Sequence, residues 1–432
     1  MRTIPPEHYL ALSRLDGFLG TSEGVYDTST LAAHDFDVDN RTGFMPPQSP
    51  VGRLEAYWEP WELILDDAIA KSLQLGDKPG ITPAEMSQSE SWRWHVRELP
   101  VLSISGLIKS ETDLRRAHLM LAWIMHFYLP PVLTYSDTVL YNWTLKTQSH
   151  EPTPALDNLH SLTLFTGTKD EQEFYLTSAR MELRGVEALE LMRSTMDEAF
   201  IGDDLAMRRI ASILVRLATV IDDLKALFTT VREGCNPTTF YTNIRPWFRG
   251  ADSDPATRKW EFAGLDTDPS FTYPPELSGP SAGQSSLIHA LDMFLGVDEF
   301  SHAAGLTGGV GPKKSPFLVR MQLYMPRHHR NFLNHLAANP RPLREIVIGA
   351  GDATLLSAYN AAVGALKRFR DCHMAIVTAY IIQPARRAAA MNVAGDGAEV
   401  DAEAPLKGTG GTELVKFLKT VRDRTATAII CT

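Results

Sequence analysis

The stretch FRDCHMAIV, residues 369–377, places a histidine, His373, inside what the spacing predicts to be a long and mostly buried helix. Gly351 and Asp352 should open this helix, and Pro384 should end it because proline interrupts helical hydrogen bonding. Steps of four and three residues put one set of side chains on a single face. They are Tyr359, Val363, Leu366, Arg370, His373, Val377 and Tyr380.

A histidine on such a face is a core residue with a hydrogen-bonded neighbour, a general base or a metal ligand. Spacing alone favours the core residue. The sharper alternative is an axial haem ligand, because a neutral imidazole on a rigid helix suits iron and Arg370 could pair with a haem propionate. The sequence contains no HExxH and no His-x-Asp/Glu, so zinc-peptidase and non-haem iron sites lack support.

Composition narrows the class of protein. The 432 residues are 44% hydrophobic and 22% charged, with a net charge of −10, which is typical of a globular protein and unfavourable for binding nucleic acid or an anionic membrane. Cys235, Cys372 and Cys431 show no CxxC or CxxCH spacing, which argues against a zinc ribbon or covalently attached haem. Few cysteines, no signal-peptide pattern and no long apolar run predict a cytoplasmic protein without a membrane span.

The remaining chain is predicted to be mainly helical, without β alternation. Asp113 should cap one helix, which should stop at Pro130, and Asp203 should start another. Further helical spacing covers 54–75, 173–192 (as one helix), 286–295 and the segment after 411.

Two segments rich in proline, small or acidic residues, 250–280 and 390–406, are expected to be loops. A polar stretch near 146–170 suggests a boundary. We therefore predict an all-α fold with a domain at 1–160 and a larger helical domain at 161–432, which includes a mobile loop at about 390–411.

Three short motifs have open interpretations. GPSAG, residues 279–283, matches the nucleophile elbow of serine hydrolases around Ser281, but the prolines before it argue against the strand that this elbow requires. It is otherwise a helix-capping loop, or a small-residue loop that lets backbone approach a flat ligand. GTGG, residues 408–411, is a turn or a substrate lid and not a Walker loop. Arg245, five residues after Phe240, is a surface residue stacked on a ring or a carboxylate-binding residue.

Taken together, six longer motifs resemble those of the indoleamine 2,3-dioxygenases. They occur in the same order and rough spacing over about residues 50–425. They are PPVLTYSDTVLYNW, NPTTFY…R, SAGQSS, LYMPRHHRNFL, CHMAIV and KGTGGTELVKFLKTVR.

This resemblance implies an all-α enzyme that uses haem b, with ferrous iron in the active state, to insert O2 across the indole C2–C3 bond of L-tryptophan, giving N-formylkynurenine. The small N-terminal domain would cover the distal side of the haem. An electron donor would reduce the iron, and L-tryptophan or a related indole would be the substrate.

The resemblance also assigns roles to single residues. His373 is implied as the iron ligand, with Arg370 as a haem-side residue paired with Asp292. Implied distal-pocket residues are Tyr135, Val139, Phe174, Ser178 and Phe240. Arg245 would bind the substrate carboxylate, Ser281 and Ala282 would lie along the haem edge, and Thr409 would sit in a lid near the substrate ammonium.

This residue set suits the chemistry, because the iron activates O2 and the protein mainly orients the substrate and excludes water. Ser178 is expected to be a minor hydrogen-bond partner and not a base. Pro280, Thr138 and Tyr175 depart from the family pattern, which puts substrate selectivity in question. The alternatives are a haem-binding relative with weak tryptophan activity, acting on another indole or without catalysis, and more distantly a serine hydrolase.

Overall fold

The structure, a computed structural model, is mostly helical, which confirms the all-α prediction. It describes residues 36–75, 78, 80–127, 133–147, 154–251, 261–263, 277–297, 317–339, 341–395 and 413–431. Within these ranges the only sheet is a two-stranded antiparallel ribbon of β1 (Thr144–Leu145) and β2 (Leu159–His160), beside an isolated bridge between Asp39 and Gly43. None of the described helices is both long and apolar enough to cross a membrane.

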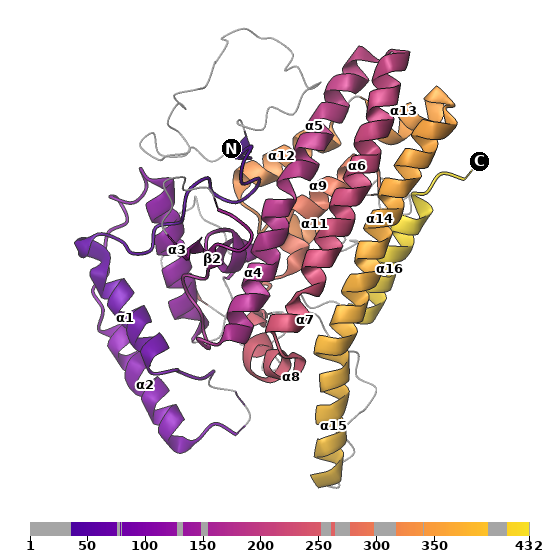
Figure 1. Ribbon diagram of the computed structural model, residues 1–432. Helices are drawn as coiled ribbons and strands as arrows, with labels where there is room; N and C mark the ends of the chain where they lie inside the picture. Colours follow the sequence, from indigo (N-terminus) through magenta and orange to yellow (C-terminus); the bar gives the residue numbers. More distant parts are fainter. Residues whose placement is uncertain are drawn as a thin grey trace, which may run out of the picture.

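The first helices lie together on one side of the molecule (Figure 1). They are η2 (Ala56–Trp58), α1 (Glu59–Ala70), α2 (Pro83–Arg97) and α3 (Glu111–His126). Their core includes Trp92 and Trp123, which are fully buried. It also takes in Phe165, whose ring stacks on Trp123 at 4.6 Å and on Trp247 at 4.5 Å. This core therefore draws on residues beyond 160, and the division into two domains stays a prediction.

Helix α3 begins earlier than the sequence suggested. Ser110 is its N-cap, with its hydroxyl accepting a hydrogen bond from the backbone N–H of Asp113. The prediction that Asp113 caps the helix is therefore wrong. An aspartate in the first turn is favoured by the helix dipole without being the cap, and the sequence pattern does not separate these two positions. Pro130 lies outside the described residues.

The segment predicted as one helix over 173–192 is two helices, α4 (Lys169–Arg184) and α5 (Val186–Ile201). Gly185 separates them. A Cβ on Gly185 would lie 2.2 Å from Cδ2 of Leu287, so this close approach requires glycine. The break depends on a residue about 100 positions away, which local spacing does not reveal.

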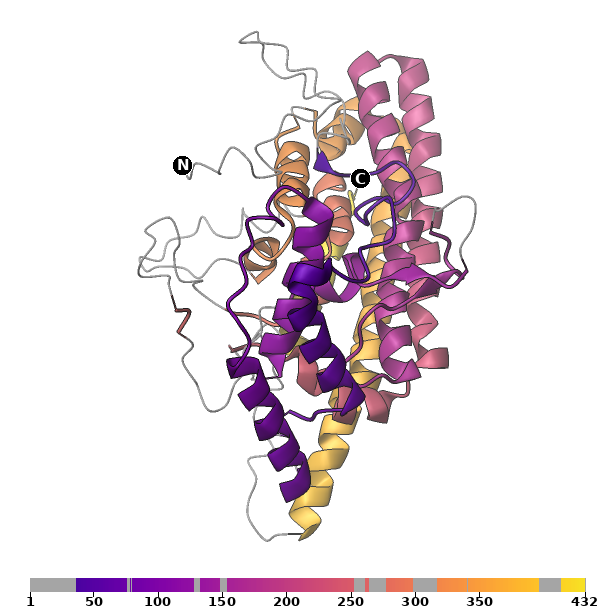
Figure 2. The ribbon, with the colours of Figure 1, turned by 90° about the vertical axis from the view of Figure 1, so that its left-hand side faces the viewer.

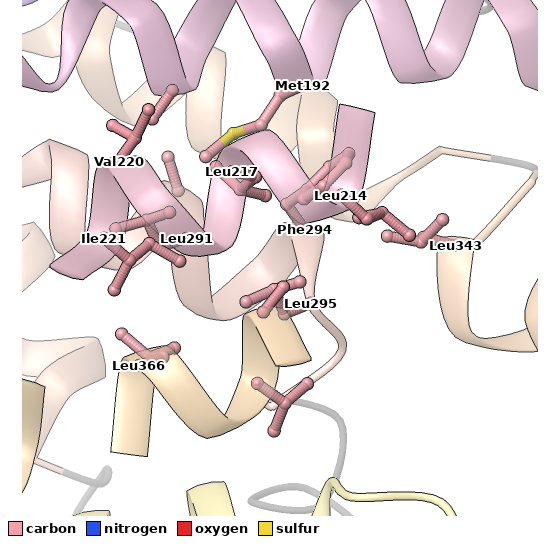
Figure 3. Close-up of a cluster of buried hydrophobic side chains, with 14 of the residues drawn as sticks. Met192, Leu214, Leu217, Val220, Ile221, Leu291, Phe294, Leu295, Leu343 and Leu366 are labelled. Atoms are coloured by element: carbon pink, nitrogen blue, oxygen red, sulfur yellow. The ribbon is translucent and has the colours of Figure 1, made fainter. Parts of the chain in front are cut away.

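The core of the larger group of helices is built on α6 (Asp204–Thr229) and α14 (Ala353–Val377). Asp203 and Asp352 cap them as predicted, each accepting backbone hydrogen bonds at the helix start. Figure 3 shows side chains of α5, α6, α9 (Ser286–Phe294) and α14 pointing toward one another. They include Met192, Leu214, Leu217, Ile221, Leu291 and Leu366.

Shorter elements complete the fold. In chain order they are η3 (Ser136–Leu140), α7 (Val231–Gly234), α8 (Pro237–Thr239), η4 (Phe240–Ile244), η5 (Arg245–Phe248), η8 (Ala282–Gln284), α11 (Phe317–Gln322), α12 (Arg327–Ala337), α13 (Leu343–Ala350) and α16 (Leu414–Thr427).

The predicted end of the α14 helix at Pro384 is wrong. A π-helical turn, η9 (Thr378–Ile382), follows α14, and α15 (Gln383–Gly395) continues along the same line, as Figures 1 and 2 show. Pro384 lies directly after this π-turn, where the backbone bonding has already shifted from the α-helical pattern, and the helix continues through it. Residues 390–395 of the predicted loop are thus helical, and 396–412 lie outside the described residues, as does most of the loop predicted at 250–280.

Candidate functional site

His373 lies between Arg370 and Val377 on the predicted stripe of α14; these two neighbours are buried and His373 itself is half-buried. Its ring meets the ring of Phe228 edge to face, with centroids 5.5 Å apart. Burial, with a smaller contribution from the positive charge of Arg370, lowers the pKa of His373 to about 4. The imidazole is therefore neutral near pH 7, and no described residue forms a hydrogen bond with it. The alternative of a hydrogen-bonded core histidine thus has no partner in the described part of the chain.

Arg370, one turn before His373, is a buried residue that ties α14 to two other helices. Its guanidinium forms an ion pair with Asp292 of α9 and donates to the hydroxyl of Thr425 and, at 3.3 Å, to the carbonyl of Val421 on α16. A buried guanidinium held by a carboxylate in this way has little freedom. The pair therefore fixes the part of α14 that carries His373.

An aromatic wall lies beside the same end of α14. The rings of Phe174 on α4 and Phe240 on η4 are 4.6 Å apart, and Phe240 also meets Tyr380 of η9 at 5.7 Å. Phe248 closes the group at 5.5 Å from Phe174. Ile376 and Cys372, which flank His373 in sequence, belong to the same apolar cluster. The fold thus brings two predicted pocket residues to the helix of the predicted ligand.

Arg245 follows η4 directly and is half-buried. Its guanidinium carbon lies 5.6 Å from the ring centre of Tyr241. Burial lowers the pKa of Arg245, although not enough to remove its charge at neutral pH. A partly desolvated guanidinium at the start of η5, directly after the element that begins with Phe240, suits an anionic group attached to a flat apolar ligand.

Tyr135 comes directly before η3 and Val139 lies within it, and both belong to an apolar cluster with Leu176 and Ala179 of α4. The hydroxyl of Tyr135 donates to Oε1 of Glu182 at 2.8 Å. Ser178 lies one turn before Glu182 on α4 and is half-buried, and its hydroxyl counteracts part of the rise in the pKa of Tyr135. The distal residues implied by the resemblance therefore meet along one face of α4.

The loop with Ser281 and Ala282 leads into η8 and α9. Ser281 is half-buried and its hydroxyl accepts from the N–H of Gly283 at 3.2 Å. Residues 277–281 form no strand, so the structural context of a hydrolase elbow is missing there. A Cβ on Gly279 would lie 2.0 Å from the carbonyl oxygen of Phe248, so this small-residue loop allows backbone to approach backbone.

Three π-helical turns lie next to predicted site residues. Tyr135 comes directly before η3, Phe240 starts η4, and η9 begins five residues after His373. π-Turns inside helices frequently mark functional sites, because their cost is retained only where geometry matters. The spacing of apolar residues does not predict them.

Thr409 lies outside the described residues, and its role as part of a lid stays a prediction. A cavity of about 290 Å³ lies elsewhere, between α5, α9, α12 and α13, and includes none of the predicted site residues in its lining.

Sequence reasoning also missed Glu182. Its spacing of four residues from Ser178 was the signal that could have identified it.

The chain was compared with known proteins. A model of the family described as "Indoleamine 2,3-dioxygenase" matches residues 32–129 and 129–428. The chain belongs to the indoleamine 2,3-dioxygenase family. It is 31% identical to indoleamine 2,3-dioxygenase 1 of Mus musculus over 427 residues, covering 92% of this chain and 95% of that protein.

Two fungal relatives also match most of this chain. Indoleamine 2,3-dioxygenase of Saccharomyces cerevisiae is 29% identical over 90% of this chain and 92% of its own length. A 6-hydroxytryptophan 2,3-dioxygenase of Fusarium equiseti is 27% identical over 92% of this chain and 97% of its own length.

Membership makes this chain an oxidoreductase of the dioxygenase type, in a haem-dependent family that acts on indoles. The residues around α14 fit such a group. His373 offers a neutral imidazole without a hydrogen-bond partner among the described residues, and Arg370 offers a buried positive charge one turn away. Ser281 is half-buried and Ala282 is exposed, on the small-residue loop before α9.

Proposed function

We propose that this protein uses haem b, held by His373, to insert O2 across the C2–C3 bond of the indole of L-tryptophan, giving N-formylkynurenine. The ferrous haem, once bound, supplies the activation of O2. An external electron donor keeps the iron reduced, and we place the protein in the cytoplasm.

One observation carries the proposal. His373 is a neutral imidazole without a hydrogen bond in the described structure, on the stretch of α14 that adjoins the ring pair of Phe174 and Phe240. A metal ligand needs a deprotonated ring nitrogen, and a flat indole needs apolar walls nearby. Membership of the indoleamine 2,3-dioxygenase family supports His373 as the metal ligand and the two rings as walls for an indole.

The chain's own residues then orient the substrate and exclude water. Phe174 and Phe240 hold the indole through their ring faces. Arg245 binds the carboxylate through its planar guanidinium and so fixes which edge of the indole faces the haem. Tyr135 and Val139 close the distal wall, and Ser178 offers a hydroxyl without serving as a base. Ser281 and Ala282 border the haem, and Thr409 completes the site near the substrate amine.

The second candidate function is the same reaction on a different indole substrate. A relative in Fusarium equiseti bears the name of a 6-hydroxytryptophan dioxygenase, and in this chain Thr138 and Tyr175 depart from the family pattern. Both are buried next to the distal residues Val139 and Phe174. A ring-substituted tryptophan is therefore the alternative substrate.

The test is an assay of the purified, haem-loaded and chemically reduced protein with O2. L-Tryptophan, 6-hydroxytryptophan and indole without the amino-acid group are offered in parallel, and the formyl product is quantified. The proposal expects turnover with L-tryptophan above that with indole. Turnover of 6-hydroxytryptophan alone would establish the second candidate, and no turnover of any indole would refute the activity.

A further inference from the structure

Glu182 is a buried acid on α4 that has no part in the proposed binding of haem or substrate. Its side chain is 2% exposed. Oε1 accepts a hydrogen bond from the hydroxyl of Tyr135 at 2.8 Å and another from the hydroxyl of Ser285 at 2.7 Å. Oε2 is buried and has no hydrogen-bond partner in the described structure. One oxygen therefore joins two segments that lie 150 residues apart in sequence.

These two segments belong to the proposed site. Tyr135 comes directly before η3, on the distal wall, and Ser285 is the N-cap of α9, directly after the loop with Ser281. A second bond reinforces the link, because the backbone N–H of Tyr135 donates to Oε1 of Gln284 at 2.7 Å. Glu182 therefore lies where the distal wall, α4 and the haem-edge loop meet.

Glu182 lacks a cation to balance a negative charge. No cationic side chain of the described residues pairs with it, and its closest polar neighbours are the hydroxyls of Tyr135 and Ser285. Charged or titratable groups of the surrounding elements are held by other partners: Arg180 by Glu173, Arg184 by Asp223, Asp137 by His118, His289 by Gly283 and His329 by Ser286. An unpaired buried carboxylate is costly, so the neutral acid is favoured.

We propose that Glu182 is a positioning residue of the dioxygenase, whose protonated carboxyl holds Tyr135 of the distal wall and Ser285 of the haem-edge loop in register. The carbonyl oxygen accepts both hydroxyl hydrogens, and the proton resides on Oε2. Burial raises the pKa of Glu182 to about 7, which agrees with this geometry. Its effect on the reaction rests on the proposed function, whereas its protonation does not.

The proton has a signature in stability. The pKa of Glu182 is about 7 in the fold and 4.5 as its ordinary value, so the folded state binds the extra proton between these values. This contribution to stability is complete below pH 4.5 and is lost as the pH rises to 7. Glu182→Gln cannot ionise and so lacks this pH dependence. The free energy of unfolding of the variant minus that of the wild type should therefore increase from pH 4.5 to 7 and then level off.

A matched control is Glu190→Gln on α5. This glutamate is largely exposed and its hydrogen bond to Arg193 lowers its pKa. Its stability difference from the wild type should stay constant above pH 4.5. Infrared spectra of the haem-loaded full chain add a direct measurement, because the wild-type minus Glu182→Gln difference at pH 5.5 should contain a carboxylic-acid C=O band that disappears by pH 8.5.

The positioning role needs a separate measurement. Glu182→Ala should lower kcat roughly ten- to hundredfold while the resting haem spectrum is kept, because a displaced wall misorients the substrate. Adding Tyr135→Phe to Glu182→Ala should cost little more, since both changes break the same contact. In Glu182→Gln the pH dependence of kcat near 7 should be lost.

The outcomes are distinguishable. A stability difference between Glu182→Gln and wild type that is flat from pH 4.5 to 8, together with an absent carboxylic-acid band, would overturn the proton assignment. Additive losses for Glu182→Ala and Tyr135→Phe would overturn the positioning role. If the wild type turns over no indole, the proposed function fails, while the stability and infrared measurements still decide whether Glu182 carries the proton.

Discussion

Arg245 shows how a single residue can set both affinity and orientation. Its guanidinium is half-buried beside Tyr241, on the turn that directly follows η4. Arg245→Lys keeps the charge but loses the planar fork. We expect kcat/KM for L-tryptophan to fall by a factor that corresponds to about 2–5 kcal/mol of transition-state stabilisation, as when one partner of a buried charge pair is removed. Steady-state kinetics with reduced enzyme measures this.

Indole without a carboxylate is the control substrate for Arg245→Lys. It offers nothing for the guanidinium to bind, so its turnover should change far less. Equal losses with indole and with L-tryptophan would show that Arg245 acts on the fold and not on the substrate carboxylate.

Residue types and spacing were enough to predict the neighbourhood of His373. The stripe runs from Tyr359 along α14 to Tyr380 in η9, and its members are buried apart from the half-buried His373, as expected because helical periodicity is a local property. Glu182 was not predicted. Its importance arises from Tyr135 and Ser285, which reach it only through tertiary packing.

Gly185 shows how one position decides where an element ends. A Cβ there would lie 2.2 Å from the side chain of Leu287 on α9, so Gly185→Ala must displace that buried side chain, α9, or the junction of α4 and α5. Overpacking of this kind costs about 1–3 kcal/mol, and urea unfolding should show the loss.

Gly364 of α14 provides the matched control for Gly185→Ala. Its Cβ would meet only the flexible end of Arg368, at 3.6 Å. Gly364→Ala should therefore stabilise the protein by about 0.5–1 kcal/mol, as expected for alanine in place of glycine inside a helix. The prediction fails if the two variants change the unfolding free energy alike.

At the level of elements, helix existence was predictable and helix ends were not. Asp203 and Asp352 were identified because a cap is local. The break at Gly185 was missed because it depends on Leu287, which meets this backbone only in the folded protein. The cap at Ser110 was missed because a serine cap and an aspartate in the first turn both suit a helix start. The π-turn before Pro384 was missed because apolar spacing does not reveal it. The motifs around CHMAIV located the candidate site better than periodicity did.

For the whole molecule, two buried histidines predict sensitivity to acid. Burial lowers the pKa of His126 and of His329 to about 3, against an ordinary value of 6.5. The unfolded chain therefore binds more protons between these values. Stability from both groups should be complete above pH 6.5 and should fall as the pH drops toward 3, which thermal unfolding across this range measures.

His126→Phe isolates one of these histidines. His126 packs against the rings of Phe165 and Trp247, so phenylalanine suits the space while removing the titration. The variant should lose less stability than the wild type between pH 6.5 and 4. Parallel curves for the two proteins would contradict the assignment.

The most direct test of the proposed haem site is haem uptake by His373→Ala. The wild type, titrated with haem, should develop the Soret band of a histidine-bound haem. His373→Ala should lose most of the bound haem while its far-UV circular dichroism stays unchanged, and His95→Ala, on the exposed face of α2, should bind haem like the wild type. If His373→Ala binds haem with an unchanged spectrum, His373 is not the iron ligand and the proposed haem site is wrong.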